Sequence, residues 1–327
     1  MLNDKVVLIT GGTGSFGNRV ARFLLTQNPG EIRIFSRDEK KQWDMKRRLP
    51  GLTYVIGDVR DERRLDYAMH GVDYVFHAAA LKQVPACEDY PDEAMKTNAI
   101  GSLNVCDAAA RAGVKTVVAL STDKAVKPVN AMGMTKALME KIVISRNLHW
   151  SDTIFSCVRY GNVMSSRGSV IPLFRDWIRH DEALRVTVPE MTRFLMTLDQ
   201  SVGLVSHAMT ESLGGEIFVR KAPACTVLDL AMAMRRKFSR RGDGHPIEIV
   251  GIRPGEKIHE VLVNEYEIKR ATEDADFITI HPEYRPPARP IDRPLGYEYT
   301  SENTERITDF ETMSALLDAA GEVDDPD

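Results

Sequence analysis

The stretch that decides the fold reads Lys5-Val6-Val7-Leu8-Ile9-Thr10 and continues directly as Gly11-Gly12-Thr13-Gly14-Ser15-Phe16-Gly17. The apolar, β-branched run predicts a buried strand, and three glycines spaced three apart predict a tight turn into a helix. Glycine lets a phosphate group approach the helix N-terminus, where free N–H groups favour anions. We therefore expect a dinucleotide site whose loop residues contact the cofactor: Gly11, Thr13, Gly14, Ser15, Phe16 and Gly17.

Five more short apolar runs follow within the first 160 residues, at 31–35, 53–56, 74–77, 116–120 and 154–158. Longer helical stretches separate them, at about 16–27, 38–48, 61–69, 91–112 and 131–147, and this alternation predicts right-handed βαβ units. The sequence therefore predicts an α/β protein with a doubly wound parallel sheet.

Beyond residue 160 the periodicity breaks up. The proline-rich stretch 285–294 predicts an extended segment, and we expect the last dozen residues to be frayed. We expect a dinucleotide-binding domain over residues 1–160, completed by elements from about 190–215. Residues 161–327 are expected to form, in the main, a smaller C-terminal substrate-binding domain.

Composition excludes several classes of protein. The chain has 327 residues, with 43 basic and 47 acidic side chains and a net charge of −4, which argues against binding to nucleic acid. It shows neither a membrane-length apolar run nor a secretory signal, so we expect a cytoplasmic protein with no membrane partner.

The cysteines, Cys87, Cys106, Cys157 and Cys225, are far apart and are expected to be reduced. The eight histidines are dispersed singly, so no metal site is expected.

The residues at the end of the second strand determine whether a dinucleotide-binding site of this kind prefers NAD or NADP. An acidic residue there accepts from a free ribose hydroxyl, whereas basic residues hold a 2′-phosphate. Ser36 and Arg37 can bind a phosphate and Lys41 can add charge, which favours NADP. Asp38 could instead serve NAD, or the whole run could be a solvated helix start.

A second acidic position follows the third strand. Asp58 and Val59 stand where a carboxylate commonly receives the adenine amino group, so we expect both to contact the cofactor. The alternative for Asp58 is a helix cap.

Further motifs complete a pattern that resembles a known family. They are His77–Ala80, Ala80–Pro85, Asn98, Leu120–Ala125, Lys136, Arg159–Val163, Ser166–Pro172, Met191–Phe194 and Gly255–Lys257. With the glycine loop and Asp58 they resemble the extended short-chain dehydrogenases/reductases, which have a Rossmann fold. Among these, the chain is most similar to the inverting UDP-N-acetylglucosamine 4,6-dehydratases of surface-polysaccharide biosynthesis.

The resemblance covers almost the whole chain and implies NADP as cofactor, UDP-N-acetylglucosamine as substrate and a homo-oligomer, either dimer or hexamer. It also implies further cofactor contacts: Ala78, Ala79, Ala80, Asn98, Lys136, Tyr160, Asn162 and Val163.

The family's usual catalytic pair is Tyr-x-x-x-Lys, but here the pair is Met132 and Lys136. A thioether cannot take a proton, so the usual base at the sugar 4-hydroxyl is missing. The capsule-type dehydratases carry the same methionine, which implies an active enzyme with Lys136 at the nicotinamide ribose.

By the same resemblance, Thr122, Asp123 and Lys124 carry the elimination of water across C5 and C6. Lys124 would take the C5 hydrogen, and Asp123 would protonate the departing C6 hydroxyl. The alternative is a surface ion pair at a loop start.

An anionic UDP-sugar needs cations and polar backbone around it. We expect Arg193 and Arg253 at the diphosphate or uridine, and the backbone of 168–172 at the uracil. The expected substrate contacts are Lys82, Arg159, Asn162, Ser169, Val170, Arg193, Arg253 and Glu256.

Two other functions stay open. A UDP-hexose 4-epimerase shares the fold and cofactor but normally uses the missing tyrosine. A non-catalytic NADP-binding regulatory protein is suggested by Met132, whereas the Thr122–Lys124 stretch argues against it.

Overall fold

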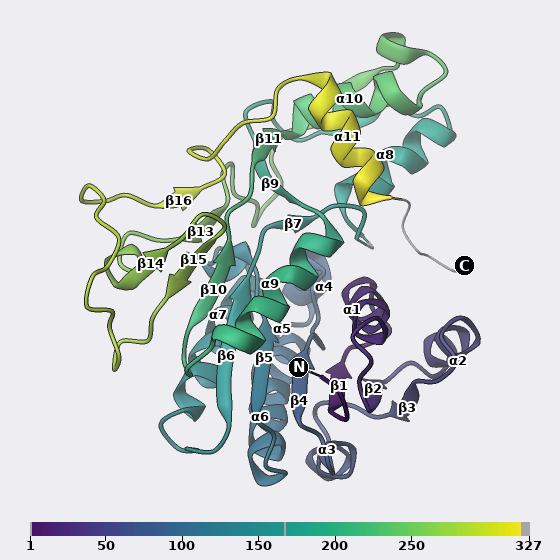
Figure 1. The fold of residues 1–327 in the computed structure, drawn as a ribbon. Coiled ribbons are helices and arrows are strands. Elements are labelled where there is room, and N and C mark those ends of the chain that lie inside the picture. Colours follow the sequence, from purple (N-terminus) through teal and green to yellow (C-terminus); the bar gives the residue numbers. More distant parts are fainter. Residues whose placement is uncertain (1, 167, 322–327) are drawn as a thin grey trace.

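A nine-stranded sheet forms the centre of the computed structural model, which describes residues 2–166 and 168–321 (Figure 1). Its order is β14-β15-β10-β6-β5-β4-β1-β2-β3. The strands from β3 to β10 are parallel, and β15 and β14 add an antiparallel edge. The strands are β1 (Val6–Thr10), β2 (Glu31–Ser36), β3 (Thr53–Ile56), β4 (Tyr74–His77), β5 (Thr116–Leu120), β6 (Ile154–Arg159), β10 (Ile217–Arg220), β14 (Ala271–Glu273) and β15 (Phe277–Ile280).

Helices cover both faces of the sheet because side chains alternate along each strand. In β1, Val7 and Ile9 are buried in one core with α1 and α9, whereas Leu8 belongs to the opposite core with α3, α6 and α7. The helices are α1 (Ser15–Leu25), α2 (Glu39–Arg48), α3 (Glu62–Met69), α6 (Gly101–Arg111), α7 (Ala131–Arg146) and α9 (Leu198–Glu211). The doubly wound parallel sheet predicted from the sequence is confirmed.

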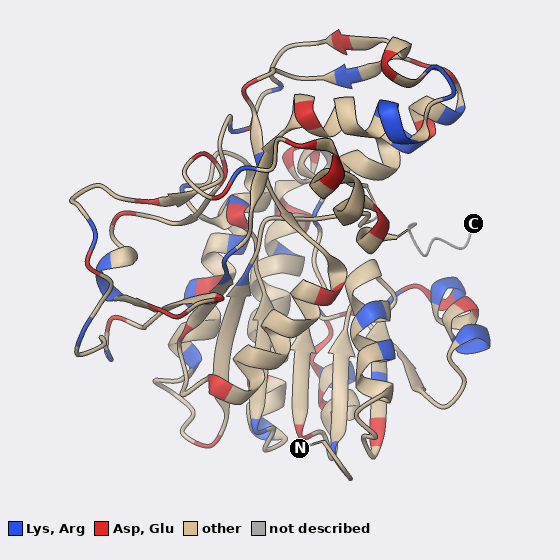
Figure 2. Ribbon diagram, turned by 45° about the horizontal axis from the view of Figure 1, so that its top comes forward, with Lys and Arg blue, Asp and Glu red and all other residues tan. Residues whose placement is uncertain are grey.

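The later part of the chain supplies a smaller group of elements, most of which surround a separate hydrophobic core, whereas β13 and β16 pack into a core of the main sheet. These elements form three short sheets. In the first, β9 lies between β7 and β11; in the other two, β8 pairs with β12 and β13 pairs with β16. These elements are β7 (Asn162–Val163), β8 (Leu184–Val186), β9 (Thr192–Met196), β11 (Ala224–Thr226), β12 (Ile247–Ile249), β13 (Val261–Val263), β16 (Tyr299–Thr300), α8 (Val170–Arg179), α10 (Val227–Phe238) and α11 (Phe310–Ala320). Figure 2 shows basic and acidic residues mixed over both parts of the molecule.

Three local features differ from the sequence-based expectation. The helix expected over 91–112 is α5 (Pro91–Ala94), a π-helical turn (Met95–Ile100) and α6, and a short helix α4 (Val84–Asp89) precedes it. Helix α11 continues to Ala320, so the fraying expected for the last dozen residues is wrong up to that point. Residues 322–327 lie outside the described part of the chain. The stretch 285–294 contains neither helix nor strand, as expected.

The four cysteines are buried and form no disulfide. Within 2–166 and 168–321, no helix is both long enough and apolar enough to cross a bilayer. The same residues contain no cluster of three or more histidine, cysteine or acidic side chains suited to a metal ion.

Candidate active site

The glycine loop after β1 is packed so tightly that larger residues would not fit. Gly11 has a φ of +65°, and a Cβ atom on it would lie 2.8 Å from the backbone of Ala78 and Ala79. A Cβ atom on Gly17 would lie 2.5 Å from the backbone of Gly12. These contacts hold the start of α1 against the ends of β1 and β4.

Gly14 is packed less tightly than Gly11 and Gly17, because it is exposed to solvent. A Cβ atom there would find one atom within 4 Å, the Gly11 carbonyl oxygen at 3.3 Å. Gly14 is also the N-cap of α1 and offers no side chain to cap it. The open N-terminus of α1 therefore fits a pyrophosphate held by the Gly11–Gly17 loop. Phe16 of this loop stacks on Tyr160, with ring centroids 6.4 Å apart.

Two charged residues after β2 have different roles: Asp38 caps a helix, and Arg37 is a partly exposed cation. Asp38 accepts from the Lys41 N–H at 2.9 Å and lies 3.3 Å from Lys41 Nζ, so its carboxylate caps α2. The Lys41 N–H lowers the pKa of Asp38. The Arg37 side chain is half exposed and pairs with Asp58 at 3.5 Å, and Ser36 Oγ accepts from Gln42 at 3.0 Å.

Asp58 lies next to these residues and does not cap a helix, because Asp61 caps α3. Burial would raise the pKa of Asp58, but hydrogen bonds from the Arg60 side chain and backbone lower it. Val59 is buried against Gly101 of α6, where a Cβ atom would lie 2.6 Å from the valine side chain. Arg37 and Asp58 thus form one polar edge beside the glycine loop.

Two buried polar residues hold the chain that leaves β4. The Asn98 amide accepts from Leu81 N at 2.8 Å and donates to Leu81 O and Thr135 Oγ1 at 3.0 Å. His77 lies between Thr10 Oγ1 at 2.6 Å and Ser102 Oγ at 2.7 Å, and burial lowers its pKa to about 3. The amide of Asn98, which was expected at the cofactor, is therefore bonded to Leu81 and to Thr135 of α7.

Met132 and Lys136 lie one turn apart on α7, and both are buried. Met132 packs with Cys87 and Ala94. Lys136 Nζ donates to the Leu120 carbonyl oxygen at 2.5 Å, at the end of β5. Burial lowers the pKa of Lys136 to about 8.

The turn after β5 carries the predicted catalytic residues. Asp123 is fully buried, and its Oδ1 accepts from Thr122 Oγ1 at 2.8 Å and from Lys124 Nζ at 3.1 Å. This ion pair lies at the carboxyl edge of a central strand and is not a surface pair, because the Asp123 side chain is 1% exposed and that of Lys124 26%.

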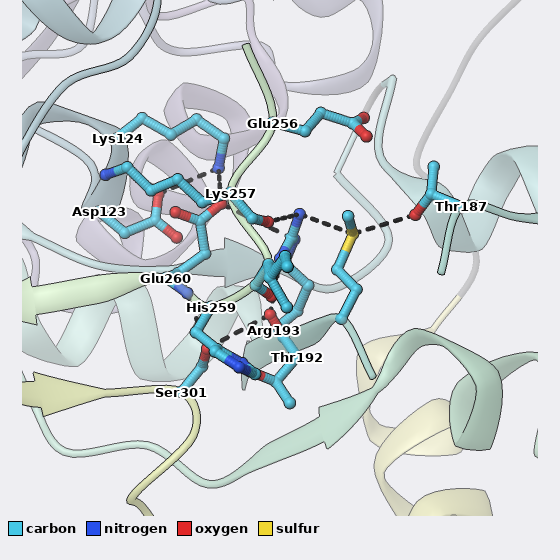
Figure 3. Close-up of polar contacts among 12 residues, drawn as sticks. Asp123, Lys124, Thr187, Thr192, Arg193, Glu256, Lys257, His259, Glu260 and Ser301 are labelled. Carbon is cyan, nitrogen blue, oxygen red and sulfur yellow. Dashed lines mark hydrogen bonds and ion pairs between the residues drawn. The ribbon is translucent and has the colours of Figure 1, made fainter. Parts of the chain in front are cut away.

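A second carboxylate, Glu260, completes this cluster and was not found from the sequence. Its Oε1 lies 3.1 Å from Lys124 Nζ and 3.7 Å from Arg193 Nε (Figure 3). Burial lowers the pKa of Lys124, but Asp123 and Glu260 raise it further, so the net direction is upward. Lys257 lies beside them with its Nζ on the Val126 carbonyl, and burial lowers its pKa. Glu260 follows the Gly255–Lys257 motif by three residues, but only the tertiary fold brings it to Lys124.

Several buried polar atoms around the strand ends have no hydrogen-bond partner among the residues that the structure describes. Buried polar groups are normally paired, so such atoms mark places where a ligand can bind. They include Ser121 Oγ, Asp123 Oδ2, Asn162 Oδ1, Ser169 Oγ and Glu260 Oε2.

Arg159 does not line the site as expected. Its side chain is 2% exposed and makes bidentate contacts with Glu140 and Glu267, at 2.6 to 3.0 Å, and a 2.8 Å bond to Leu262 O. Every polar arm of the guanidinium is therefore used within the protein, and Arg159 ties β6 to α7 and to the segment after β13. The expected substrate contact is a structural ion pair, because a buried guanidinium needs carboxylates around it.

The remaining expected substrate residues lie in several separate segments. Arg193 donates to the carbonyls of Thr192, Lys257 and Ile258, which fixes it beside Glu260. Glu256 accepts from the Arg253 N–H at 3.3 Å in an exposed turn. The other expected substrate contacts are Lys82 after β4, Asn162 at the start of β7, and Ser169 and Val170 at the start of α8. Val163, expected at the cofactor, follows Asn162 in β7.

Known proteins match this chain over nearly its whole length. The family model described as "Polysaccharide biosynthesis protein" matches residues 7–282. Proteins named UDP-glucose 4-epimerase from Rickettsia felis and Rickettsia prowazekii are each 48% identical over 97% of this chain and 96% of their own length.

Solved structures show the same fold. The structure of Pen from Bacillus thuringiensis has a TM-score of 0.89 and 38% identity, over 97% of this chain and 98% of its own. The dTDP-glucose 4,6-dehydratase DesIV from Streptomyces venezuelae, with NAD and TYD bound, has a TM-score of 0.69 and 21% identity over 77% and 86%. The UDP-glucose 4-epimerase of Thermotoga maritima, with UDP-glucose, has a TM-score of 0.64 and 20% identity over 77% and 92%. The chain belongs to the polysaccharide biosynthesis protein family and shares its fold with solved structures of a dTDP-glucose 4,6-dehydratase and a UDP-glucose 4-epimerase.

Proposed function

We propose that this protein is a nucleotide-sugar 4,6-dehydratase that acts on UDP-N-acetylglucosamine and inverts C5. The reaction oxidises C4, removes water across C5 and C6 and reduces C6. The product is a 4-keto-6-deoxy sugar for surface-polysaccharide biosynthesis.

One observation supports the choice of reaction: a buried pair of ionisable side chains, Asp123 and Lys124, lies directly after β5. At the family's usual base position stands Met132, which cannot take a proton. Asp123 and Lys124, by contrast, are in contact at 3.1 Å at the carboxyl end of a central strand, where open α/β sheets bind their ligands. An elimination needs one base and one acid, whereas hydride exchange at C4 alone needs neither at C5 or C6.

The roles then follow from the chemistry of each group. Lys124 takes the proton from C5, which is acidified by the C4 ketone, and Asp123 gives a proton to the departing C6 hydroxyl. The unpaired Asp123 Oδ2 leaves that carboxyl group an oxygen for substrate. Thr122 donates to Asp123 Oδ1 and so fixes the carboxyl plane.

A nicotinamide dinucleotide fits the open N-terminus of α1 described above. When bound, it would supply the hydride transfer that oxidation at C4 and reduction at C6 require. Gly11–Gly17 would hold its pyrophosphate, and Lys136, 2.5 Å from the Leu120 carbonyl, would hold the nicotinamide ribose.

NADP is the proposed form of the cofactor. Both Asp38 oxygens contact Lys41, so this carboxylate already serves as the cap of α2. Arg37 is half exposed and can leave its 3.5 Å pairing with Asp58 for a 2′-phosphate, next to Ser36.

A UDP-hexose 4-epimerase is the second candidate, because the Rickettsia proteins that carry this name are 48% identical to the chain. An epimerase would return hydride to C4 and would need no proton transfer at C5 or C6.

Mass spectrometry after incubation with UDP-N-acetylglucosamine separates the candidates. Loss of one water supports the dehydratase. A product of unchanged mass with the opposite configuration at C4 would establish the epimerase, and no conversion would favour a binding protein. UDP-glucose in a parallel reaction tests whether the acetamido group is required.

A further inference from the structure

The turn that carries Arg253 is a small unit closed by its own hydrogen bonds. Arg253 N donates to Glu256 Oε2 at 3.3 Å, and Glu256 N donates to the Arg253 carbonyl oxygen at 3.2 Å. Pro254 and Gly255 stand between them, and Gly255 has a φ of +77°. Proline followed by a glycine with positive φ is typical of a type II turn. Arg253 is exposed at the start of this turn, which moves as one piece.

Among the residues that the structure describes, one hydrogen bond ties this turn to the rest of the protein. Asn130 Nδ2 donates to the Gly255 carbonyl oxygen at 2.9 Å, across 125 positions of sequence. The next anchors along the chain are at Gly251 and Lys257, outside the turn. Gly255 also packs closely on Asn130, since a Cβ atom on the glycine would lie 3.3 Å from the asparagine Cβ. The place of the turn therefore depends on Asn130.

Asn130 begins α7 with the other end of the same amide. Its Oδ1 accepts from Gly133 N at 2.8 Å as the N-cap, and the residue is 4% exposed. An amide accepts through its oxygen and donates through its nitrogen, on two separate atoms. Serine offers a single oxygen, so it can replace the cap but not the nitrogen that reaches Gly255. One side chain thus fixes both the start of α7 and the turn that carries Arg253.

We propose that Asn130 is a positioning residue that holds Arg253 in place for the UDP group of the substrate. The inference rests on the proposed function, in which the substrate is a UDP-sugar, and on the expected place of Arg253 at its diphosphate or uridine. A turn that is already held in the free protein does not have to be ordered when the nucleotide binds. Without the bond to Gly255 the free protein populates other positions of the turn, and binding must restore the competent one. The bond therefore contributes to nucleotide affinity.

The test measures UDP binding to the full-length, NADP-loaded protein by calorimetry. UDP is the probe because it carries the groups that Arg253 is expected to contact and undergoes no reaction. Asn130→Ser keeps an oxygen for the cap of α7 and removes the nitrogen that reaches Gly255. We expect UDP to bind about 5- to 10-fold more weakly, within the range for one hydrogen bond. The Tm and a separate titration with NADP should stay near wild type, because the cap is retained.

Two further variants separate the cap from the bond to the turn. Asn130→Ala removes both, so it should weaken UDP binding as Asn130→Ser does and also lower the Tm by about 2 °C. Arg253→Ala should itself weaken UDP binding. Adding Asn130→Ser to Arg253→Ala should cause no further loss, because the turn then carries no cation to position.

Wild-type affinity for UDP in Asn130→Ser or in Arg253→Ala would overturn the inference. So would a further loss in the double variant, since Asn130 would then act on UDP by another route than Arg253. An equal loss of UDP and NADP binding in Asn130→Ser would also contradict it, because α7 as a whole would be disturbed. If the wild type binds no UDP, the proposed substrate class fails instead. If it binds UDP but forms no dehydrated product, the proposed reaction fails and the role of Asn130 is retained.

Discussion

Met132 lies one helical turn before Lys136 on α7, and the two side chains are 5% and 7% exposed. Met132 fills an apolar space beside Cys87 and Ala94, whereas Lys136 reaches the Leu120 carbonyl. The position at which the family resemblance leads us to expect a proton acceptor is thus a packing position here.

Met132→Leu should therefore keep most of the activity, because a change that conserves volume costs little in an apolar site. The steady-state rate of dehydration measures this directly. Lys136→Met is the contrasting variant and should lose activity, because it removes the cation expected at the ribose. An inactive Met132→Leu protein of normal stability would contradict the account.

The roles of Asp123 and Lys124 are separable by isotope exchange. Lys124→Ala should abolish exchange of the C5 hydrogen with heavy water, since that proton must leave first. Asp123→Asn should allow C4 oxidation and C5 exchange but slow the loss of water by about 10²- to 10⁴-fold, the usual effect of a missing general acid. Wild-type exchange at C5 in Lys124→Ala would move the base to another residue, such as Lys82.

The preference for NADP depends on Arg37. Arg37→Ala should weaken binding of NADP by about 1.5 kcal/mol, the lower end for a charge-assisted hydrogen bond, because the side chain is half exposed. Binding of NAD should change little. Calorimetric titration of both cofactors measures the difference, and an equal loss for both would argue against contact with the 2′-phosphate.

Burial of Lys136 predicts a pH-dependent stability. Burial lowers its pKa from 10.5 to about 8, so the folded state gives up this proton before the unfolded chain does. The cost of burying the ammonium is complete below about pH 8 and is relieved as the pH rises from about 8 toward 10.5. Relative to Lys136→Met, the wild type should therefore gain about 2 kcal/mol of unfolding free energy between about pH 7 and about pH 9.5. Denaturant titrations of both proteins measure this, and a constant difference would show that Lys136 is not desolvated.

The parallel sheet was predictable because each central strand is a short apolar run between turn signals. Strands β3, β4 and β5 coincide with the expected ranges, and β1, β2 and β6 differ by one residue at one end. The short strands of the second part were largely missed, because two or three residues, as in β7 or β16, carry no periodicity. The π-helical turn at 95–100 was also missed, since its composition matches an ordinary helix.

The site was predictable where function and local sequence coincide, and less so where distant segments meet. The glycine loop is one local unit, and its open α1 N-terminus is as expected. Glu260 approaches Lys124 only through the tertiary fold, so no spacing in the sequence could place it there. The prediction that Arg159 contacts substrate was wrong for the same reason. Its partners Glu140 and Glu267 lie on other elements, and no pattern in the sequence indicates that they surround it.

The most direct test of the proposed function follows one hydrogen atom. UDP-N-acetylglucosamine carrying deuterium at C4 is converted by the purified protein, and the product is examined by NMR and mass spectrometry. The account predicts loss of one water and deuterium at C6, because the hydride removed from C4 returns to C6 in the same active site. A product that retains both the water and the deuterium at C4, with the C4 configuration inverted, would contradict the dehydratase and establish an epimerase.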